Sequence, residues 1–174
     1  VFVVIDDVTT RESRPIQLAF HAPVPFELPS PCEDPTGEDG DVTVTVVNSP
    51  ALARLTFCAE PNAVAAHLEH TDCFPVDPER SHENEYPSQW HLTTGFDAAD
   101  RERLLVTVIQ VAQEGDVLPP VSVSYNGSAS GIDGQRVVAV TTGGHTAKLR
   151  VNRFGSSLEC AGPGTAMLEV SAQR

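Results

Sequence analysis

The feature that most constrains this chain is a series of short, alternating, β-branched segments separated by clusters of Pro, Gly, Asp and Asn. A period of two residues is typical of β-strands, and the periodicity of an amphipathic helix is nearly absent. Closely spaced short strands with turn residues between them are typical of sandwiches. The sequence therefore predicts an all-β fold, an antiparallel two-sheet β-sandwich of roughly ten strands.

The predicted strands differ in pattern. Arg103–Val111 is the clearest, and Val42–Val47 is β-branched almost throughout. Val1–Val8 is apolar on both faces up to Asp6, which is typical of a buried central strand. A proline-rich stretch from Pro23 to Pro35 is expected to interrupt any ladder. The other predicted strands are Ile16–His21, Leu52–Ala59, Gln89–Thr94, Val121–Tyr125, Gly134–Thr141, Thr146–Val151 and Ala166–Val170.

The length favours one domain. A chain of 174 residues is long enough to bury a core without help from a metal or a disulfide. We therefore predict a single β-sandwich domain over residues 1–174, with a long polar loop at about 60–87. A loop of this length inside a compact domain is typical of a functional or partly disordered segment.

The charge is strongly acidic, with 24 Asp and Glu against 11 Lys and Arg, a net charge of −13. This balance argues against nucleic acid and anionic membranes as partners, because both attract basic surfaces. The longest purely apolar stretch, Val1–Ile5, is too short for a membrane span. Two interpretations of the acidic surface stay open, solubilisation and cation binding.

Four cysteines without a C-x-x-C pair exclude a zinc ribbon or a thioredoxin motif. Pairing of Cys58 with Cys73, and of Cys32 with Cys160, would give two disulfides, and the even count favours a secreted, extracellular protein. Asn126 begins a glycosylation acceptor pattern.

One cluster carries the residue types of a metal site. His67, His70 and Asp72 lie close together in the sequence, and zinc or calcium accepts such ligands. On a helical turn, His67 and His70 would lie on one side. The competing interpretation is a solvated acidic loop. Motifs for a nucleophile or a phosphate-binding glycine loop are missing, so the sequence shows no self-contained catalytic site.

Three groups of segments follow the pattern of one known domain. They are Val1–Val8 followed by Leu18–His21, Ser88–Leu92 with Arg103–Val111, and Gly134–Val140. In this order they resemble the opening, a later pair of strands and the next strand of the β-sandwich domain of heparinase II/III-like polysaccharide lyases.

The resemblance implies a partner and a site. In that family a helical toroid joins the sandwich, and the enzyme cleaves uronic-acid polysaccharides by β-elimination. It also implies a structural zinc ion, with Asp6 matching the aspartate of the opening strand and His21 near a second ligand. We therefore expect a non-catalytic sandwich domain of a secreted lyase that supports a helical catalytic domain and binds an acidic polysaccharide.

Two alternatives belong to other classes. The first is an exported structural subunit that self-assembles into a filament or surface layer, with Val1, Phe2, Val3, Val4 and Ile5 donated as a strand to the next copy. The second is a calcium-dependent adhesion or glycan-binding module, which rests on the acidic loops alone.

Overall fold

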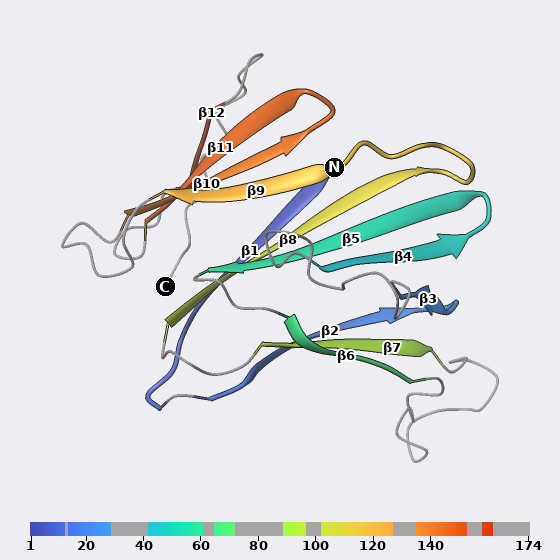
Figure 1. Ribbon diagram of the computed structural model, residues 1–174, viewed down its shortest axis with the longest axis horizontal. Coiled ribbons are helices and arrows are strands. Elements are labelled where there is room, and N and C mark those ends of the chain that lie inside the picture. The colour runs from blue at the N-terminus through green and yellow to red at the C-terminus, as the bar shows by residue number, and fades with distance from the viewer. Residues whose placement is uncertain are drawn as a thin grey trace. The chain divides into compact units, whose positions relative to one another are not determined.

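The computed structural model describes residues 1–12, 14–28, 42–60, 65–71, 89–96, 102–126, 135–152 and 158–161 (Figure 1). Within these ranges the chain is all-β, with twelve strands and no helix, and every paired strand runs antiparallel to its neighbour. The strands are β1 (Phe2–Thr9), β2 (Ile16–Ala22), β3 (Phe26–Glu27), β4 (Val42–Asn48), β5 (Ala51–Glu60), β6 (Ala65–Thr71), β7 (Trp90–Phe96), β8 (Glu102–Gln113), β9 (Val121–Asn126), β10 (Gln135–Thr142), β11 (His145–Asn152) and β12 (Leu158–Ala161).

The strands fall into two compact units, Val1–Leu118 and Pro119–Arg174. The single domain expected from the length stays a prediction, and each unit is described by itself.

The first unit contains two sheets. The larger has the order β1-β8-β5-β4-β3, and the smaller has the order β2-β7-β6. Strand β8 pairs with β1 on one side and with β5 on the other. With 12 residues it is the longest strand of the unit.

One apolar core connects these two sheets. Its buried residues come from β2 and β7 of the smaller sheet and from β3, β4, β5 and β8 of the larger. The rings of Phe20 in β2 and Phe57 in β5 lie 5.3 Å apart between centroids, at a tilt of 52°. The buried members are Ala22, Phe26, Val42, Val44, Leu55, Phe57, Leu92 and Leu105.

The burial of strand β8 explains why its sequence shows no alternation of apolar and polar residues. Leu104–Val108 are each at most 1% exposed, so both faces of the strand are buried. A strand buried on both faces needs apolar or β-branched side chains at every position, not at every second one.

Strand β1 corrects one prediction. We expected Val1–Val8 to be a buried central strand, but β1 lies at the end of the strand order and has β8 as its neighbour. The apolar pattern led to the wrong position because it reports apolar side chains, not the number of neighbouring strands. Phe2 and Val4 are in fact exposed.

The second unit is a four-stranded sheet with the order β12-β11-β10-β9. Gly143 and Gly144 join β10 to β11 with φ angles of 56° and 78°. Positive φ at both central residues is what a two-residue type I′ hairpin requires. Two adjacent glycines between two strand patterns are a sequence signal for such a turn.

Each predicted strand within the described residues is confirmed as a strand, and Ala166–Val170 lies outside them. Three strands were not predicted. The two-residue β3 lies in the proline-rich stretch, β12 follows β11, and β6 lies in the segment expected to be a loop at about 60–87. The expectation of a loop is therefore wrong at Ala65–Thr71.

Candidate functional site

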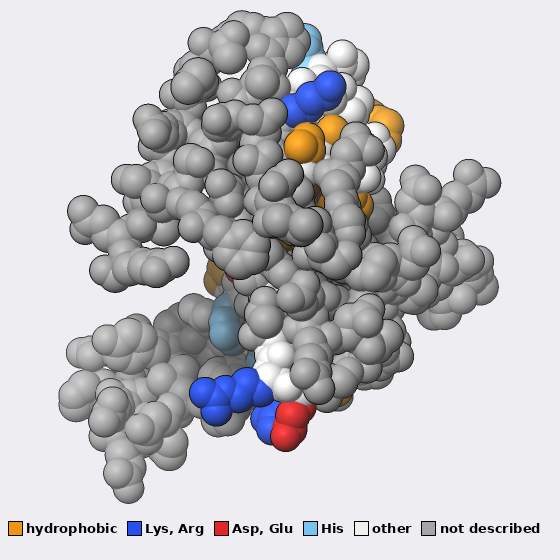
Figure 2. Space-filling model, turned by 90° about the vertical axis from the view of Figure 1, so that its left-hand side faces the viewer, with side chains coloured by type: hydrophobic (Ala, Val, Ile, Leu, Met, Phe, Trp, Pro, Cys, Tyr) orange, Lys and Arg blue, Asp and Glu red, His pale blue; other side chains and the backbone are white. Residues whose placement is uncertain are grey.

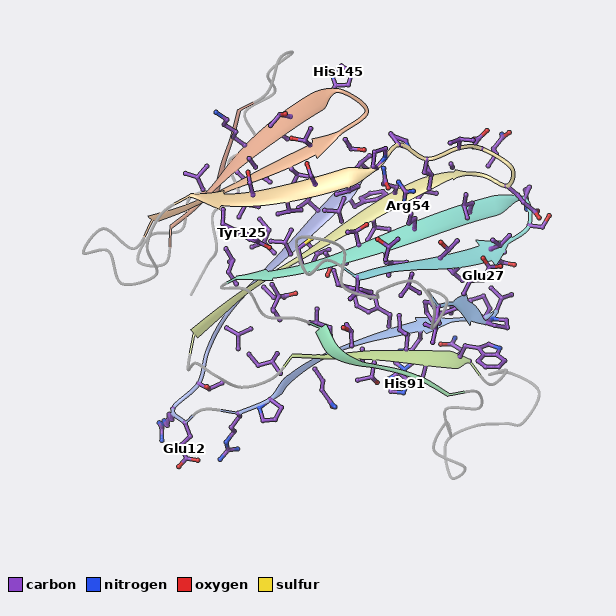
Figure 3. All side chains as sticks on the ribbon, viewed as in Figure 1. Glu12, Glu27, Arg54, His91, Tyr125 and His145 are labelled. Atoms are coloured by element: carbon purple, nitrogen blue, oxygen red, sulfur yellow. The ribbon has the colours of Figure 1, made fainter. Side chains whose placement is uncertain are left out.

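The outer face of the smaller sheet carries two stacked imidazole rings. His21 of β2 lies directly opposite His91 of β7, with ring centroids 4.6 Å apart and planes 29° apart. His91 Nε2 also lies 3.3 Å from the Oγ1 atom of Thr93. Neighbouring Trp90 and Leu92 pack into the core, so the two-residue alternation of β7 directs His91 and Thr93 to the other face. Figure 3 labels His91 on this strand.

Strand β6 brings two more histidines into the same sheet at the level of the backbone. Thr71 pairs with His91, His70 with Leu92 and His67 with Gly95. Positions three apart on a strand belong to opposite faces of the pleat. The helical-turn argument that would place His67 and His70 on one side is therefore wrong, because these residues form a strand.

Asp6 and His21, which the resemblance implies as metal ligands, lie in different sheets. Asp6 is in β1, opposite Leu105 of β8, whereas His21 is in β2. Within the described residues, no group of three or more His, Cys, Asp or Glu side chains is arranged to hold a metal ion. Asp72 lies outside those residues, and the zinc or calcium site stays a prediction.

The cysteines are described in part. Cys58 is a buried residue of β5, opposite Val106, and Cys160 is in β12, opposite Leu149. Cys32 and Cys73 lie outside the described residues, so both disulfides stay predictions. Asn126 ends β9, and its glycosylation stays a prediction too.

The sequence analysis missed a polar pair of half-buried Arg54 and buried Gln110. The Nε and Nη2 atoms of Arg54 both donate to Gln110 Oε1, at 2.9 and 2.6 Å, between β5 and β8. Gln110 is 1% exposed. Burial lowers the pKa of Arg54 below its usual value, because desolvation disfavours the charged guanidinium. Arg54 and Gln110 face each other on β5 and β8. Hydrogen bonds from a charged donor between them therefore favour the observed register of the two strands.

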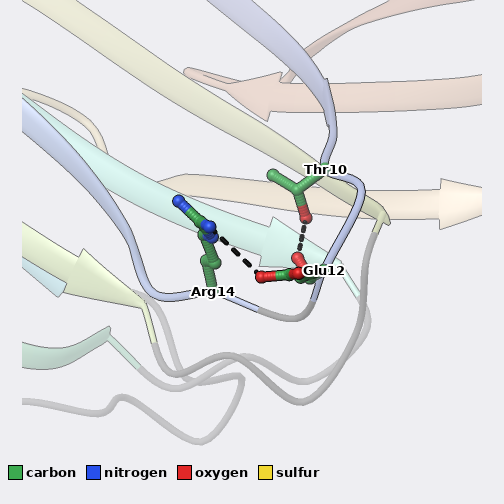
Figure 4. Close-up of polar contacts among 3 residues, drawn as sticks. All are labelled: Thr10, Glu12 and Arg14. Atoms are coloured by element: carbon green, nitrogen blue, oxygen red, sulfur yellow. Dashed lines mark hydrogen bonds and ion pairs between the residues drawn. The ribbon is translucent and has the colours of Figure 1, made fainter.

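The turn between β1 and β2 contains a polar group of three residues, Thr10, Glu12 and Arg14 (Figure 4). Thr10 Oγ1 donates to the Glu12 carbonyl at 2.6 Å, and Arg14 Nη2 donates to Glu12 Oε2 at 3.1 Å. With Arg11 they border an open hollow of about 480 Å³. Figure 2 shows cationic side chains beside an acidic one on one face of the molecule. Both partners of the ion pair are at least 70% exposed, and such pairs contribute little to stability.

The last candidate is an exposed apolar strip, defined here as Phe2 and Val4 of β1 with Val111 of β8. Phe2 lies opposite Ile109, which packs against the core, and Val4 and Val111 share its face by the two-residue alternation. The strip is thus an extension of the core face of the larger sheet. Its three side chains are 63%, 41% and 53% exposed. Exposed apolar side chains that gather on one face are a feature of interaction sites.

The structure also places the strand that was predicted to be donated. β1 pairs with β8 of its own chain from Phe2 to Thr9, so donation to another copy would require this pairing to be exchanged.

Comparisons of the chain with protein-family models, with curated proteins and with solved structures find no match. In the part of the chain that the structure describes, no helix is long and apolar enough to cross a membrane.

Proposed function

We propose that this chain is a non-catalytic β-sandwich domain of a secreted polysaccharide lyase resembling the heparinase II/III enzymes. In this proposal the two sheets of the first unit stack as the sandwich. The domain supports a helical catalytic domain and contributes contacts to an acidic, uronic-acid glycan.

The observation that carries the proposal is the exposed apolar strip beside the core. The core face of the larger sheet continues into exposed Phe2, Val4 and Val111. Another protein domain could pack on these side chains and bury them. Burying a valine or phenylalanine side chain contributes about 1.5–3 kcal/mol, so three such residues form a useful anchor for docking. A supporting domain needs a surface of this kind, whereas a self-contained enzyme does not.

The stacked histidines support the glycan part of the proposal. His21 and His91 lie side by side on the outer face of the smaller sheet, with Thr93 next to them. Imidazole nitrogens and a threonine hydroxyl donate to, and accept from, the hydroxyl and carboxylate groups of an acidic sugar. These residues would bind and orient the chain of the polysaccharide.

The chemistry would belong to the catalytic domain. β-Elimination of a uronic-acid glycan needs a base for the C5 proton, an acid for the leaving oxygen and neutralisation of the carboxylate. In the sequence of this chain no convergent set of that kind is recognised.

The experiment combines the purified chain with the separately expressed helical domain of a heparinase II/III-like lyase. β-Elimination of heparinoid or alginate is followed by the absorbance of the unsaturated uronate product. We expect no turnover by the chain alone and a higher rate for the helical domain when the chain is added. Turnover by the isolated chain, or no effect on the helical domain, would contradict the proposal.

Two variants separate docking from glycan contact. Phe2→Ser/Val4→Ser should weaken the effect on the helical domain, whereas His21→Ala/His91→Ala should weaken retention of the chain on an immobilised acidic glycan. Val117→Ser is the matched control, because Val117 is 94% exposed and lies outside the strip. A loss for Val117→Ser equal to that for the strip variant would remove the docking assignment.

A further inference from the structure

Strand β1 is the long, open edge of the larger sheet. Among the described residues it has β8 as its one neighbour, and it pairs with β8 over eight residues without a bulge. The opposite edge, β3, has two residues. An edge strand presents a row of backbone donors and acceptors, and proteins usually block long edges with charged side chains, proline or a bulge. β1 contains no proline and no bulge, and its charged residues are Asp6 and Asp7.

The side chains distinguish β1 from the other long edge strands whose side chains are described. β1 exposes Phe2 and Val4, whereas β2 and β9 have no large exposed apolar side chain. An added strand at β1 would therefore gain backbone hydrogen bonds and also cover apolar surface.

Asp6 and Asp7 determine which strand fits. They follow the apolar residues directly and are the two charged residues of β1. Like charges on directly opposed strand positions are destabilising, and opposite charges are stabilising. A cationic strand would therefore be selected over a neutral or acidic one.

The same charges disfavour a second copy of this chain. Parallel pairing in register would place Asp6 opposite Asp6 and Asp7 opposite Asp7. Antiparallel pairing over the whole strand would place Phe2 opposite Thr9 and Asp6 opposite Ile5, which gathers all four carboxylates in the middle of the pair. The net charge of −13 on each copy adds to the repulsion.

We propose that the edge of β1 binds an extended strand of another polypeptide, with apolar residues facing Phe2 and Val4 and with Lys or Arg opposite Asp6 and Asp7. The partner adds a sixth strand to the five-stranded sheet by β-augmentation. This inference does not rest on the lyase function, because it follows from the edge, the exposed side chains and the charges.

The test uses the full chain and two synthetic peptides of nine residues that alternate Val and Thr. One carries Lys at the two positions that would oppose Asp6 and Asp7, and the other carries Glu there. Binding is measured by fluorescence anisotropy. We expect the lysine peptide to bind at least about tenfold more tightly, because two attractive pairs replace two repulsive ones.

Variants of the chain assign the effect to β1. Asp6→Asn/Asp7→Asn should remove the preference for the lysine peptide. Phe2→Ser/Val4→Ser should weaken the binding of both peptides. Val117→Ser is the control with unchanged binding, and circular dichroism checks that each variant keeps its strand content.

Three results would overturn the proposal. They are equal affinity for the two peptides, no binding of either peptide, and a dimer of the unmodified chain that Phe2→Ser/Val4→Ser abolishes. The last result would make a second copy the occupant. Failure of the lyase assay together with selective binding of the lysine peptide would leave this inference intact and reject the proposed function alone.

Discussion

The contact between Phe20 and Phe57 offers a direct test of how the two sheets of the first unit pack. Phe57 is buried in β5 of the larger sheet, and Phe20 is a half-buried residue of β2 in the smaller one. Their ring centroids are 5.3 Å apart at a tilt of 52°, within the range of favourable aromatic pairs. If the sheets stack as a sandwich, these two rings must be energetically coupled.

The expected magnitudes follow from burial. Phe57→Ala removes a buried ring and leaves a cavity, which lowers the free energy of unfolding by about 3–5 kcal/mol. Phe20→Ala removes a half-buried ring, and we expect a loss of about 2 kcal/mol. In the double mutant each residue has already lost its partner, so the combined loss should fall short of the sum by about 0.5–1.5 kcal/mol.

Urea denaturation followed by tryptophan fluorescence measures these values. Trp90 is the single tryptophan of the chain and packs against the same core, so its emission reports on this unit. Phe57→Ala combined with Val117→Ala is the additive control, because Val117 is 94% exposed. A coupling energy below about 0.3 kcal/mol for Phe20 and Phe57 would be no larger than that of independent sites, and would refute face-to-face packing of the sheets.

Three further sets of substitutions test other parts of the fold by urea denaturation, which is followed by tryptophan fluorescence in the first unit and by circular dichroism for Gly143 in the second unit. Gln110→Leu should lower the free energy of unfolding by about 2 kcal/mol, because Arg54 loses its bonds to Gln110 Oε1, and Arg54→Met in the same chain should restore much of that loss. Thr94→Val and Thr107→Val should each be neutral or stabilising by up to about 1 kcal/mol, because both hydroxyls are buried with no hydrogen-bond partner among the described residues. Gly143→Ala should lower the free energy of unfolding by about 1–2 kcal/mol because its φ is +56°, and Gly143→Asn should lower it less. The argument for Gln110 is contradicted if adding Arg54→Met lowers the free energy of unfolding further. The argument for the threonines is contradicted if Thr94→Val or Thr107→Val lowers it by more than about 1 kcal/mol. The argument for Gly143 is contradicted if Gly143→Asn lowers it more than Gly143→Ala does.

The strands could be predicted from the sequence wherever the side chains themselves favour an extended backbone. Val42–Asn48 is β-branched at nearly every position, and Leu104–Val108 is apolar or β-branched throughout. In these segments local propensity and burial agree. The turn at Gly143 and Gly144 was predictable for the same local reason, since glycine adopts positive φ without strain.

Strand β6 was missed because its residues do not favour an extended backbone by themselves. The segment Ala65–Thr71 contains two alanines, two histidines, one glutamate and one threonine, and its one strongly apolar residue is Leu68. It is a strand because β7 offers it a pairing edge, in a register with an irregularity between Ala65 and His67. A pattern in one segment does not report on a partner that lies elsewhere in the chain.

The candidate site residues were predicted only in part, and the residues that were missed were missed for a related reason. His21 was singled out but its partner His91 was not, because the pairing of β2 with β7 is a property of the register. Arg54 and Gln110 are 56 positions apart and come together through the pairing of β5 with β8. Strand periodicity determines faces, whereas the identity of a cross-strand neighbour needs the sheet order.

Asp6 and Asp7 lead to a last prediction about self-association. Charges on an open edge prevent non-specific pairing with other strands, and the same charges select a partner of opposite sign. If they protect β1, then Asp6→Asn/Asp7→Asn should increase dimer formation, because the apolar residues of the edge remain while the repulsion is removed. Sedimentation velocity over a concentration series measures this change, with Asp116→Asn as a control of similar charge in the exposed turn after β8. The prediction is contradicted if the double variant, like Asp116→Asn, stays as monomeric as the unmodified chain. In that case something other than the carboxylates of β1 prevents its edge from pairing.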